Sequence, residues 1–278
     1  MTFFFGYYIK ESIMITKKEH SLHSFYRFDT LSLERATLIH AITQRDTRRD
    51  YDASMALHTG EKRPLIVANR WRVAHEIIAK EDLSSYLFVV ANQTHSDHIK
   101  IITKKEMLGW ESMESAVEDC DALITDLPRV VLNILTADCV PILLYDPHKK
   151  VVAAIHAGWR GSHMKIVEKS ISMMQSHFGS SASDILAGIG PAIGKCCYEV
   201  DRDVAKHFDA YPQALEQKAE KYMLDLIEIN KIQLIASGLK EQHIETSGIC
   251  TSCQVERYFS YRKELGCSGR FMSMIGLK

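Results

Sequence analysis

The chain has 278 residues, 46% of them hydrophobic, so it can bury a sizeable core as one large domain or two closely packed halves. Its 34 Lys and Arg residues balance 35 Asp and Glu residues, and the net charge of -1 excludes a global field that attracts nucleic acid, anionic membranes or acidic partners. Seven cysteines are an odd number and too few for a disulfide scaffold, which favours a reducing cytoplasm.

Residues 1–25 are interpreted as an N-terminal extension. The apolar run from Phe3 to Ile9 ends at Lys10, far short of a membrane span, and no basic segment precedes it as in a signal peptide. Met14 is a second possible start. Because no low-complexity segment, repeat or Pro/Gly/Ser linker follows, we expect residues 26–278 to form a single catalytic domain.

Short runs of β-branched or aromatic residues, each bounded by turn residues, predict strands. In chain order the runs are Tyr86 to Ala91, Ile99 to Thr103, Val130 to Leu135, Ile142 to Tyr145, Val151 to His156 and Ile185 to Ile189. Apolar residues at helical spacing predict helices over residues 162–178, 200–208 and 223–237, with Gly179 and Gly238 ending the first and third. Strands and helices alternate without a regular βαβ rhythm, which favours an α+β fold.

Three residues near predicted strand ends form a possible metal-ligand set. Cys139 and His156 lie on either side of a short strand, and His95 lies upstream. A thiolate with two imidazoles suits Zn²⁺, and three protein ligands leave a fourth position for water or substrate, as in catalytic zinc sites. Taken singly, each residue would more often be structural, and spacing alone allows His98 in place of His95. If the three meet, the chain is expected to be an enzyme.

Other polar groups lie close to these candidates in the sequence. Asp138, in a loop between two apolar runs, could orient a ligand or substrate, although an aspartate there as readily caps or turns the loop. Gly158 and Gly161 are predicted to start the helix of residues 162–178. Its N-terminal amides could hold an anion, with Arg160 adding a charge-assisted contact.

The C-terminal part contains a further cysteine motif. His243-Ile244-Glu245 followed by Cys250-Thr251-Ser252-Cys253 imitates the nucleobase zinc deaminases, but the proline before the first cysteine is missing and the intervening segment is very short. That assignment is rejected. Cys250 and Cys253 could form half of a structural zinc site, yet the only other close pair is Cys196-Cys197, whose adjacency is poor ligand geometry. Ordinary packing is therefore the predicted role.

A series of short motifs runs in a specific order from about residue 40 to the C-terminus. They are Gln93-Thr94-His95, Asp121-Ala122-Leu123-Ile124-Thr125, Thr136-Ala137-Asp138-Cys139-Val140-Pro141, His156-Ala157-Gly158-Trp159-Arg160-Gly161, Gly190-Pro191-Ala192-Ile193-Gly194 with Cys197-Tyr198-Glu199-Val200, and Phe259-Ser260-Tyr261-Arg262 with Gly269-Arg270. In identity and order they resemble the motifs of the YfiH-type family of purine nucleoside phosphorylases, long labelled polyphenol oxidases or laccases.

The resemblance implies a zinc site of His95, Cys139 and His156, which makes His98 a neighbour, and Asp138 is added as a candidate catalytic residue. It implies phosphorolysis of adenosine, inosine, guanosine and methylthioadenosine, together with hydrolytic deamination of adenosine. The implied fold is a three-layer α+β structure with mixed sheets, distantly similar to the cytotoxic necrotizing factor toxins.

The implied reactions require particular groups. Phosphorolysis requires a phosphate aimed at the anomeric carbon, and arginines bind phosphate well. Four arginines occupy positions similar to the family's, and they are the expected phosphate or substrate ligands: Arg45, Arg70, Arg160 and Arg262. In the deamination, zinc would lower the pKa of water and supply hydroxide for attack at the purine C6 carbon. The expected partners are purine nucleosides and phosphate, and the balanced charge favours a monomer.

The chain departs from the family pattern after Arg45. Residues 46–50 and 54–58 replace a glycine pair and a later Asn-Leu element, and Ser96 replaces a glycine. The first two segments would line the substrate side, so the purine preference and the full set of activities can differ from the family's, whereas the metal ligands are unaffected.

Two other classes of function are compatible with single features of the sequence. Copper-dependent polyphenol oxidation requires many paired histidines, but no His-x-His occurs among the 13 histidines, so copper is less favoured than zinc. A metal-free hydrolase would use Cys139 as nucleophile and His156 as base. His95 favours a metal over this alternative and over a non-catalytic scaffold.

Overall fold

The computed structural model describes residues 25–78 and 81–278, which form three sheets. A five-stranded sheet has the order β1 (Phe25–Tyr26), β2 (Leu38–Thr43), β14 (Phe271–Leu277), β6 (Val130–Thr136) and β3 (Leu87–Val90). A six-stranded sheet has the order β13 (Ile244–Thr246), β9 (Leu186–Ile189), β7 (Val140–Asp146), β8 (Val151–Ala157), β5 (Ala122–Thr125) and β4 (Ile99–Ile101). A small sheet joins β10 (Glu199–Val200), β12 (Lys221–Leu224) and β11 (Leu215–Lys218).

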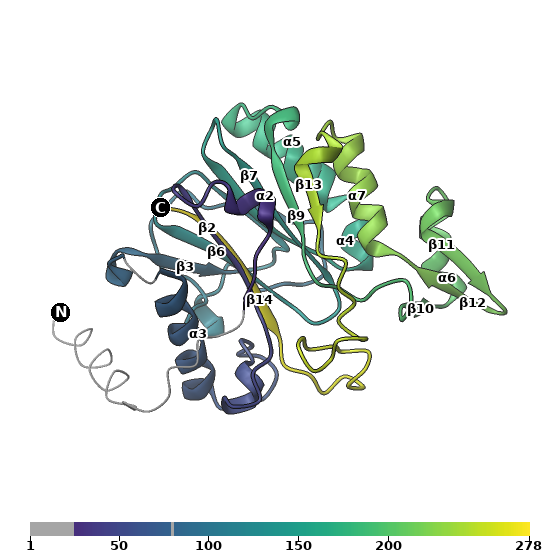
Figure 1. The fold of residues 1–278 in the computed structure, drawn as a ribbon, viewed down its shortest axis with the longest axis horizontal. Coiled ribbons are helices and arrows are strands. Elements are labelled where there is room, and N and C mark those ends of the chain that lie inside the picture. Colours follow the sequence, from purple (N-terminus) through teal and green to yellow (C-terminus); the bar gives the residue numbers. More distant parts are fainter. Residues whose placement is uncertain (1–24, 79–80) are drawn as a thin grey trace.

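Helices connect and cover these strands (Figure 1). The α-helices are α2 (Asp29–Ser32), α3 (Arg63–Ile78), α4 (Trp159–His163), α5 (Ile166–Phe178), α6 (Arg202–Ala205) and α7 (Leu226–Ala236). Short 3₁₀ turns lie at Asp50–Ala53, Leu83–Ser85, Met113–Ser115, Ala182–Asp184, Lys206–Phe208, Pro212–Ala214 and Glu241–His243. No helix within the two described ranges is both long and apolar enough to cross a membrane.

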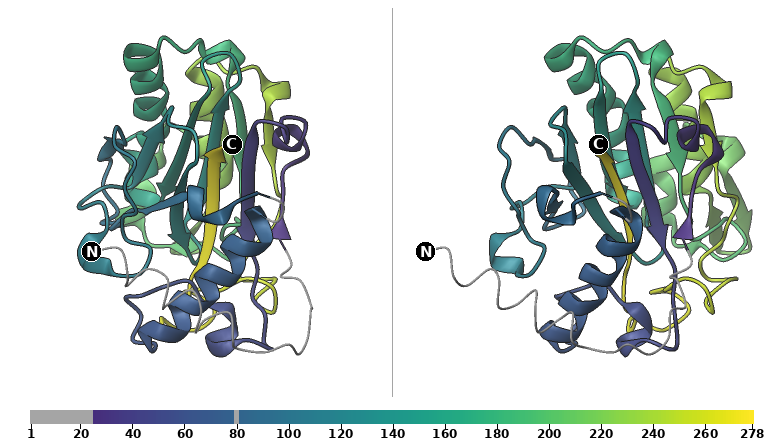
Figure 2. Two further views of the ribbon diagram at one scale, coloured as in Figure 1. Left: turned by 90° about the vertical axis from the view of Figure 1, so that its left-hand side faces the viewer. Right: turned by 60° about the vertical axis from the view of Figure 1, so that its left-hand side comes forward.

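The two large sheets pack face to face, and helices cover their outer faces (Figure 2). In β7, Ile142 and Leu144 face α5 and α7, whereas Leu143 and Tyr145 pack between the sheets, because successive side chains of a strand alternate in direction. On the far side, α3 covers the five-stranded sheet. Within the described residues the layers therefore follow the order helix, sheet, sheet and helix, one layer more than the three implied by the resemblance.

The strand pairing confirms a mixed α+β fold. The β3/β6, β4/β5 and β9/β13 pairs are parallel, and the other strand pairs are antiparallel. Every run of residues predicted to be a strand is one, with ends shifted by one or two residues. The predicted N-terminal extension lies outside the described residues, apart from Phe25, which begins β1.

The predicted helices are shorter than expected. The helix over residues 162–178 is divided into α4 and α5 by Lys165, whose φ of 62° is left-handed, while Gly179 ends α5 as predicted. The amides after Gly158 therefore begin the short helix α4, of 5 residues, and not the long helix expected there, and their binding of an anion stays a prediction. The helix predicted over 223–237 begins only after Asp225, whose side chain caps it by accepting a hydrogen bond from the Glu228 N–H at 3.0 Å.

The helix predicted over residues 200–208 is also interrupted. Its first residue, Val200, ends strand β10, and the α-helical part is confined to α6. The 3₁₀ turn Lys206–Phe208 follows directly and buries Phe208 in the core cluster that also contains residues of α5 and α7. The apolar spacing therefore located the buried face correctly but overestimated the length of regular helix.

Candidate functional site

The structure brings the predicted metal ligands together at one end of the six-stranded sheet. β7 and β8 form an antiparallel pair in which Val140 lies opposite Ala157, so Cys139, just before β7, lies beside the end of β8 where His156 is located. His95 enters from the loop between β3 and β4, and its Nε2 lies 3.8 Å from Cys139 Sγ. The ligand atoms of all three residues lie within 4.8 Å of one another.

His98, the alternative that spacing left open, is directed elsewhere. Its Nδ1 lies 2.9 Å from an Asp119 carboxylate oxygen, and both side chains are about half exposed. The three-residue offset from His95 thus places the two imidazoles in different surroundings.

Asp121 positions both histidines, although the sequence analysis gave it no role. Its buried carboxylate accepts a hydrogen bond from the Nδ1–H of His156 at 2.6 Å, which leaves Nε2 of that ring available to a ligand. The same carboxylate accepts bonds from the backbone N–H groups of Thr94, His95 and Ser96 at 3.2, 3.1 and 2.7 Å. These bonds support the left-handed φ of 61° at His95.

The charge state of Asp121 follows from these contacts. Burial alone would raise the pKa of its carboxyl group, but hydrogen bonds and attraction from His156, together with hydrogen bonds from Ser96, lower that pKa to about 2. The carboxylate therefore stays ionised at neutral pH and can orient the imidazole of His156.

Cys139 and His156 stabilise each other's charged forms. Burial opposes charge on both groups, but the attraction between thiolate and imidazolium outweighs it, so the pKa of Cys139 is lowered and that of His156 is raised. A hydrogen bond and electrostatic attraction from His95 also lower the pKa of Cys139. The thiol is therefore readily deprotonated, as a metal ligand or a nucleophile must be.

Asp138 was considered as a carboxylate that could orient a ligand or substrate, but its contacts indicate a different role. It has a φ of 92°, and its carboxylate accepts the Thr251 hydroxyl at 2.6 Å and the Arg262 backbone N–H at 2.7 Å. Its backbone carbonyl accepts the Ile193 N–H at 2.9 Å. Asp138 therefore ties three chain segments to the loop that carries Cys139, while Asp121 orients the histidines.

The three candidate ligands open onto a cavity of about 520 Å³, a size typical of small-molecule sites. Its wall is mainly aromatic and apolar, with a few polar groups. The larger lining side chains are Met113, Leu135, Trp159, Ile193, Tyr198, Tyr261, Arg262 and Arg270. His58, from the segment that departs from the family pattern, also lines the cavity.

Only one of the four predicted arginines lines this cavity. Arg262 does so, with its guanidinium donating to the Glu199 carbonyl at 2.9 Å and lying 5.3 Å from the Tyr198 ring centroid. Arg270 also lines it, 5.7 Å from the ring centroid of Tyr261. The sequence analysis included Arg270 in a motif but did not select it as a ligand.

The other three arginines are placed differently. Arg70 is fully buried and donates to the carbonyls of Met55, Gly109 and Trp110, so it holds the scaffold together. The guanidinium of Arg45 is paired with the carboxylates of Asp52 and Glu264. Arg160 is exposed and lies over the Trp159 ring at 4.6 Å. None of these three arginines lines the cavity, so their role as phosphate or substrate ligands stays a prediction.

Comparison with known proteins agrees with the fold. Residues 40–278 match the family described as multi-copper polyphenol oxidoreductase laccase, and the chain belongs to that family. It is 36% identical over 228 residues to the purine nucleoside phosphorylase YlmD of Bacillus subtilis, covering 80% of this chain and 81% of that protein. It is 34% identical over 189 residues to the adenosine deaminase RL5 of an unknown prokaryotic organism, covering 66% and 72%.

A solved structure shows the same architecture. The Bacillus licheniformis hypothetical protein YfiH superposes with a TM-score of 0.80 at 35% identity, over 87% of this chain and 93% of that one. These likenesses confirm the family indicated by the sequence motifs, and they make the chain an enzyme of the kind to which these relatives belong.

Proposed function

We propose that this protein is a zinc-dependent purine nucleoside phosphorylase that also deaminates adenosine. The observation that carries the proposal is the meeting of His95, Cys139 and His156 at a cavity whose wall includes Arg262 and Arg270. The names of the relatives, a purine nucleoside phosphorylase and an adenosine deaminase, support the two activities. Adenosine, inosine, guanosine and methylthioadenosine are the proposed substrates.

The three side chains fit zinc by their chemistry and spacing. One sulfur and two nitrogen ligands lie close enough to share an ion, and Asp121 fixes the ring orientation of His156. When bound there, zinc supplies a Lewis acid and lowers the pKa of water towards neutrality. Three protein ligands would leave a fourth coordination position for water or substrate, as in catalytic zinc sites, and all three residues line the cavity.

In the proposed phosphorolysis, a phosphate oxygen forms a bond to the anomeric carbon while the bond from that carbon to the purine nitrogen breaks. The electron pair leaves with the base, which takes up the proton that hydrogen phosphate gives up, and the products are the free base and the 1-phosphate of the sugar. Arg262 and Arg270 are the cationic groups placed to bind phosphate. Trp159, Tyr198 and Tyr261 offer ring faces to the purine.

In the proposed deamination, water adds to the purine C6 carbon and ammonia leaves, so that adenosine becomes inosine. The same aromatic wall would hold the purine in both reactions. The two reactions therefore differ in whether phosphate or water is the attacking group.

A product assay with adenosine separates these activities. Adenine and ribose 1-phosphate should form only when phosphate is present, whereas inosine and ammonia should form with or without phosphate. His95→Ala and Cys139→Ala should abolish both, whereas His98→Ala, which removes a neighbouring exposed imidazole, should retain both. Full activity in both ligand variants would refute the proposal.

The lowered pKa of Cys139 and the raised pKa of His156 also suit a metal-free hydrolase. Metal analysis discriminates between the two. Protein purified without chelator should contain zinc, and Cys139 should then resist iodoacetamide. Reaction of iodoacetamide with Cys139 before any chelator is added would favour the hydrolase, and copper-dependent oxidation of a phenol by metal-verified protein would favour the oxidase.

A further inference from the structure

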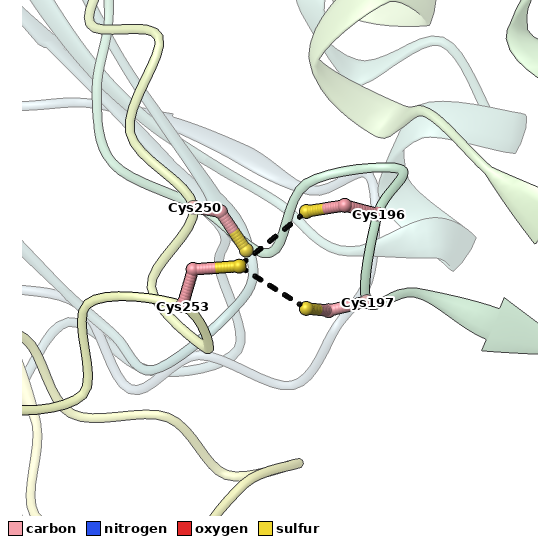
Figure 3. Close-up of side chains that lie close together, drawn as sticks. All are labelled: Cys196, Cys197, Cys250 and Cys253. Carbon is pink, nitrogen blue, oxygen red and sulfur yellow. Dashed lines mark hydrogen bonds between the residues drawn. The ribbon is translucent and has the colours of Figure 1, made fainter.

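A second group of potential metal ligands lies outside the proposed active site. Cys196 and Cys197, in the turn that follows Gly194, meet Cys250 and Cys253, in the turn that follows β13 (Figure 3). The Sγ atom of Cys253 lies 3.6 Å from that of Cys196 and 3.4 Å from that of Cys197. All four sulfur atoms lie within 4.8 Å of one another.

This arrangement differs from the ordinary packing expected from the sequence. A cysteine that packs as a small apolar group is normally buried. Cys196 and Cys253 are instead exposed, and Cys197 and Cys250 are only partly buried. The adjacency of Cys196 and Cys197 is also no obstacle, since both side chains point towards Cys250 and Cys253 (Figure 3).

The spacing fits a tetrahedral metal site. With zinc–sulfur bonds of about 2.3 Å, the sulfur atoms of a tetrahedron lie about 3.8 Å apart. The separations of 3.6 and 3.4 Å from Cys253 Sγ are close to that value, and the other sulfur–sulfur distances are within 4.8 Å. Four soft thiolates in this geometry select zinc or iron rather than a hard cation.

Backbone hydrogen bonds hold the two turns together. The Ala192 N–H donates to the Ile249 carbonyl at 3.2 Å, and the Thr251 N–H donates to the Ala192 carbonyl at 3.0 Å. The Gly194 N–H donates to Cys250 Sγ at 3.3 Å, a contact that favours the thiolate form. The cysteines are thus preorganised by neighbouring chain segments.

We propose that Cys196, Cys197, Cys250 and Cys253 bind one Zn²⁺ ion in a closed, structural tetrathiolate site. Four protein ligands leave no open coordination position, so this ion would not take part in chemistry. Its binding energy would add directly to the stability of the two turns. The site is independent of the His95, Cys139 and His156 group and of the function proposed for it.

The place of this site in the fold indicates what it stabilises. The first turn lies between Ile193 and Tyr198, and the second leads into the loop of Tyr261 and Arg262. All four of these residues line the cavity. A metal ion that joins the two turns would therefore fix one wall of the substrate pocket from outside.

The first test is the zinc content of the purified protein, measured by elemental mass spectrometry in chelator-free buffer. We expect the double variant Cys196→Ser/Cys253→Ser to contain one zinc ion per chain fewer than the wild type. Cys267→Ser, which removes an exposed cysteine outside the group, should contain as much as the wild type. This difference in zinc content is expected whether or not the group of His95, Cys139 and His156 binds metal.

X-ray absorption identifies the ligands. In His95→Ala/Cys139→Ala, which disables the other group, the remaining zinc should have four sulfur neighbours at about 2.3 Å. The proposal is overturned if His95→Ala/Cys139→Ala contains no zinc. It is likewise overturned if Cys196→Ser/Cys253→Ser contains as much zinc as the wild type. Iron in place of zinc would overturn it as well.

Thiol labelling tests the wild-type protein directly and does not depend on the folding of any variant. Cys267 should react with iodoacetamide at once, whereas Cys196 and Cys253, although also exposed, should react only after zinc is removed by a chelator. Immediate labelling of all three, or disulfides among the four cysteines in protein purified with reductant, would contradict the proposal.

Discussion

One carboxylate links the two histidines of the proposed active site. The Asp121 carboxylate accepts hydrogen bonds from the ring of His156 and from the backbone N–H groups around His95. A single side chain therefore sets the position of two candidate ligands. Partners of this kind raise ligand basicity and fix the tautomer. The residue is thus a positioning residue, since it acts through the histidines.

We expect Asp121→Asn to lower zinc affinity and phosphorolysis by about 10- to 100-fold. An amide carries no charge to stabilise the His156 ring, and its NH₂ group cannot accept the N–H bonds that the carboxylate receives. Zinc titration and kcat/KM measurements would show this. The matched variant Asp119→Asn, which alters an exposed carboxylate beside His98, should have little effect, and equal losses in both would argue against positioning.

The backbone at Gly158 lies against the ligands. A Cβ atom there would be 3.1 Å from Cys139 Sγ and 3.1 Å from His95 Cδ2, which is tight enough to displace one of them. We therefore expect Gly158→Ala to reduce kcat/KM by roughly 10- to 100-fold, because small misplacements at reacting centres are costly. Unfolding in urea should change little. Unchanged kinetics with unchanged zinc content would show that the site adapts.

Residue types alone predicted metal-ligand candidates that meet in the structure, but they did not predict which arginines line the cavity. A cysteine and two histidines near strand ends are few enough to single out, and they do converge. Arginines serve scaffolds and surfaces as well, and Arg70 shows the difficulty, because its guanidinium is fully buried among backbone carbonyls. Asp121 was missed because its contacts are 25 to 35 residues away in the chain.

At the level of elements, six of the apolar strands were predicted, whereas α3 and β2, which bury polar residues, were not. The buried face of α3 includes Asn69 and Arg70, which obscures its helical periodicity. The strand β2 carries the buried His40. Lys165 separates α4 from α5 by adopting a left-handed backbone conformation. A lysine, unlike a glycine, gives no sequence signal for such a break.

His40 gives β2 a pH-dependent contribution to stability. Burial first, and Arg27 second, lower its pKa to about 4, while Glu245 raises it in part, and its Nε2 accepts the Phe28 N–H at 3.0 Å. The unfolded chain, with the ordinary value of 6.5, binds a proton before the folded chain does. The free energy of unfolding should therefore fall as pH decreases from about 6.5 to about 4.

The expected loss from this one group is at most about 3 kcal/mol. Urea unfolding of the wild type and of His40→Gln between pH 7 and pH 4 would measure it. The glutamine variant does not titrate, so its stability should depend less on pH in this range. Parallel curves for the two proteins would show that other groups cause the pH dependence.

At the scale of the whole molecule, close packing between distant segments joins the two large sheets. Phe28, between β1 of one sheet and α2, lies directly on Gly188 of β9 in the other sheet. An added Cβ at Gly188 would lie 2.4 Å from Phe28 Cδ2, closer than real contacts allow. The ring is fully buried, so it has little freedom to move away.

We expect Gly188→Ala to destabilise the protein by about 1–3 kcal/mol through overpacking, without changing the metal ligands. Phe28→Leu alone should also destabilise it by leaving part of the ring volume empty. In the double variant the smaller leucine relieves the clash, so the combined loss in urea unfolding should be less than the sum of the single losses. Strictly additive losses would mean that Gly188 and Phe28 do not depend on each other in joining the sheets.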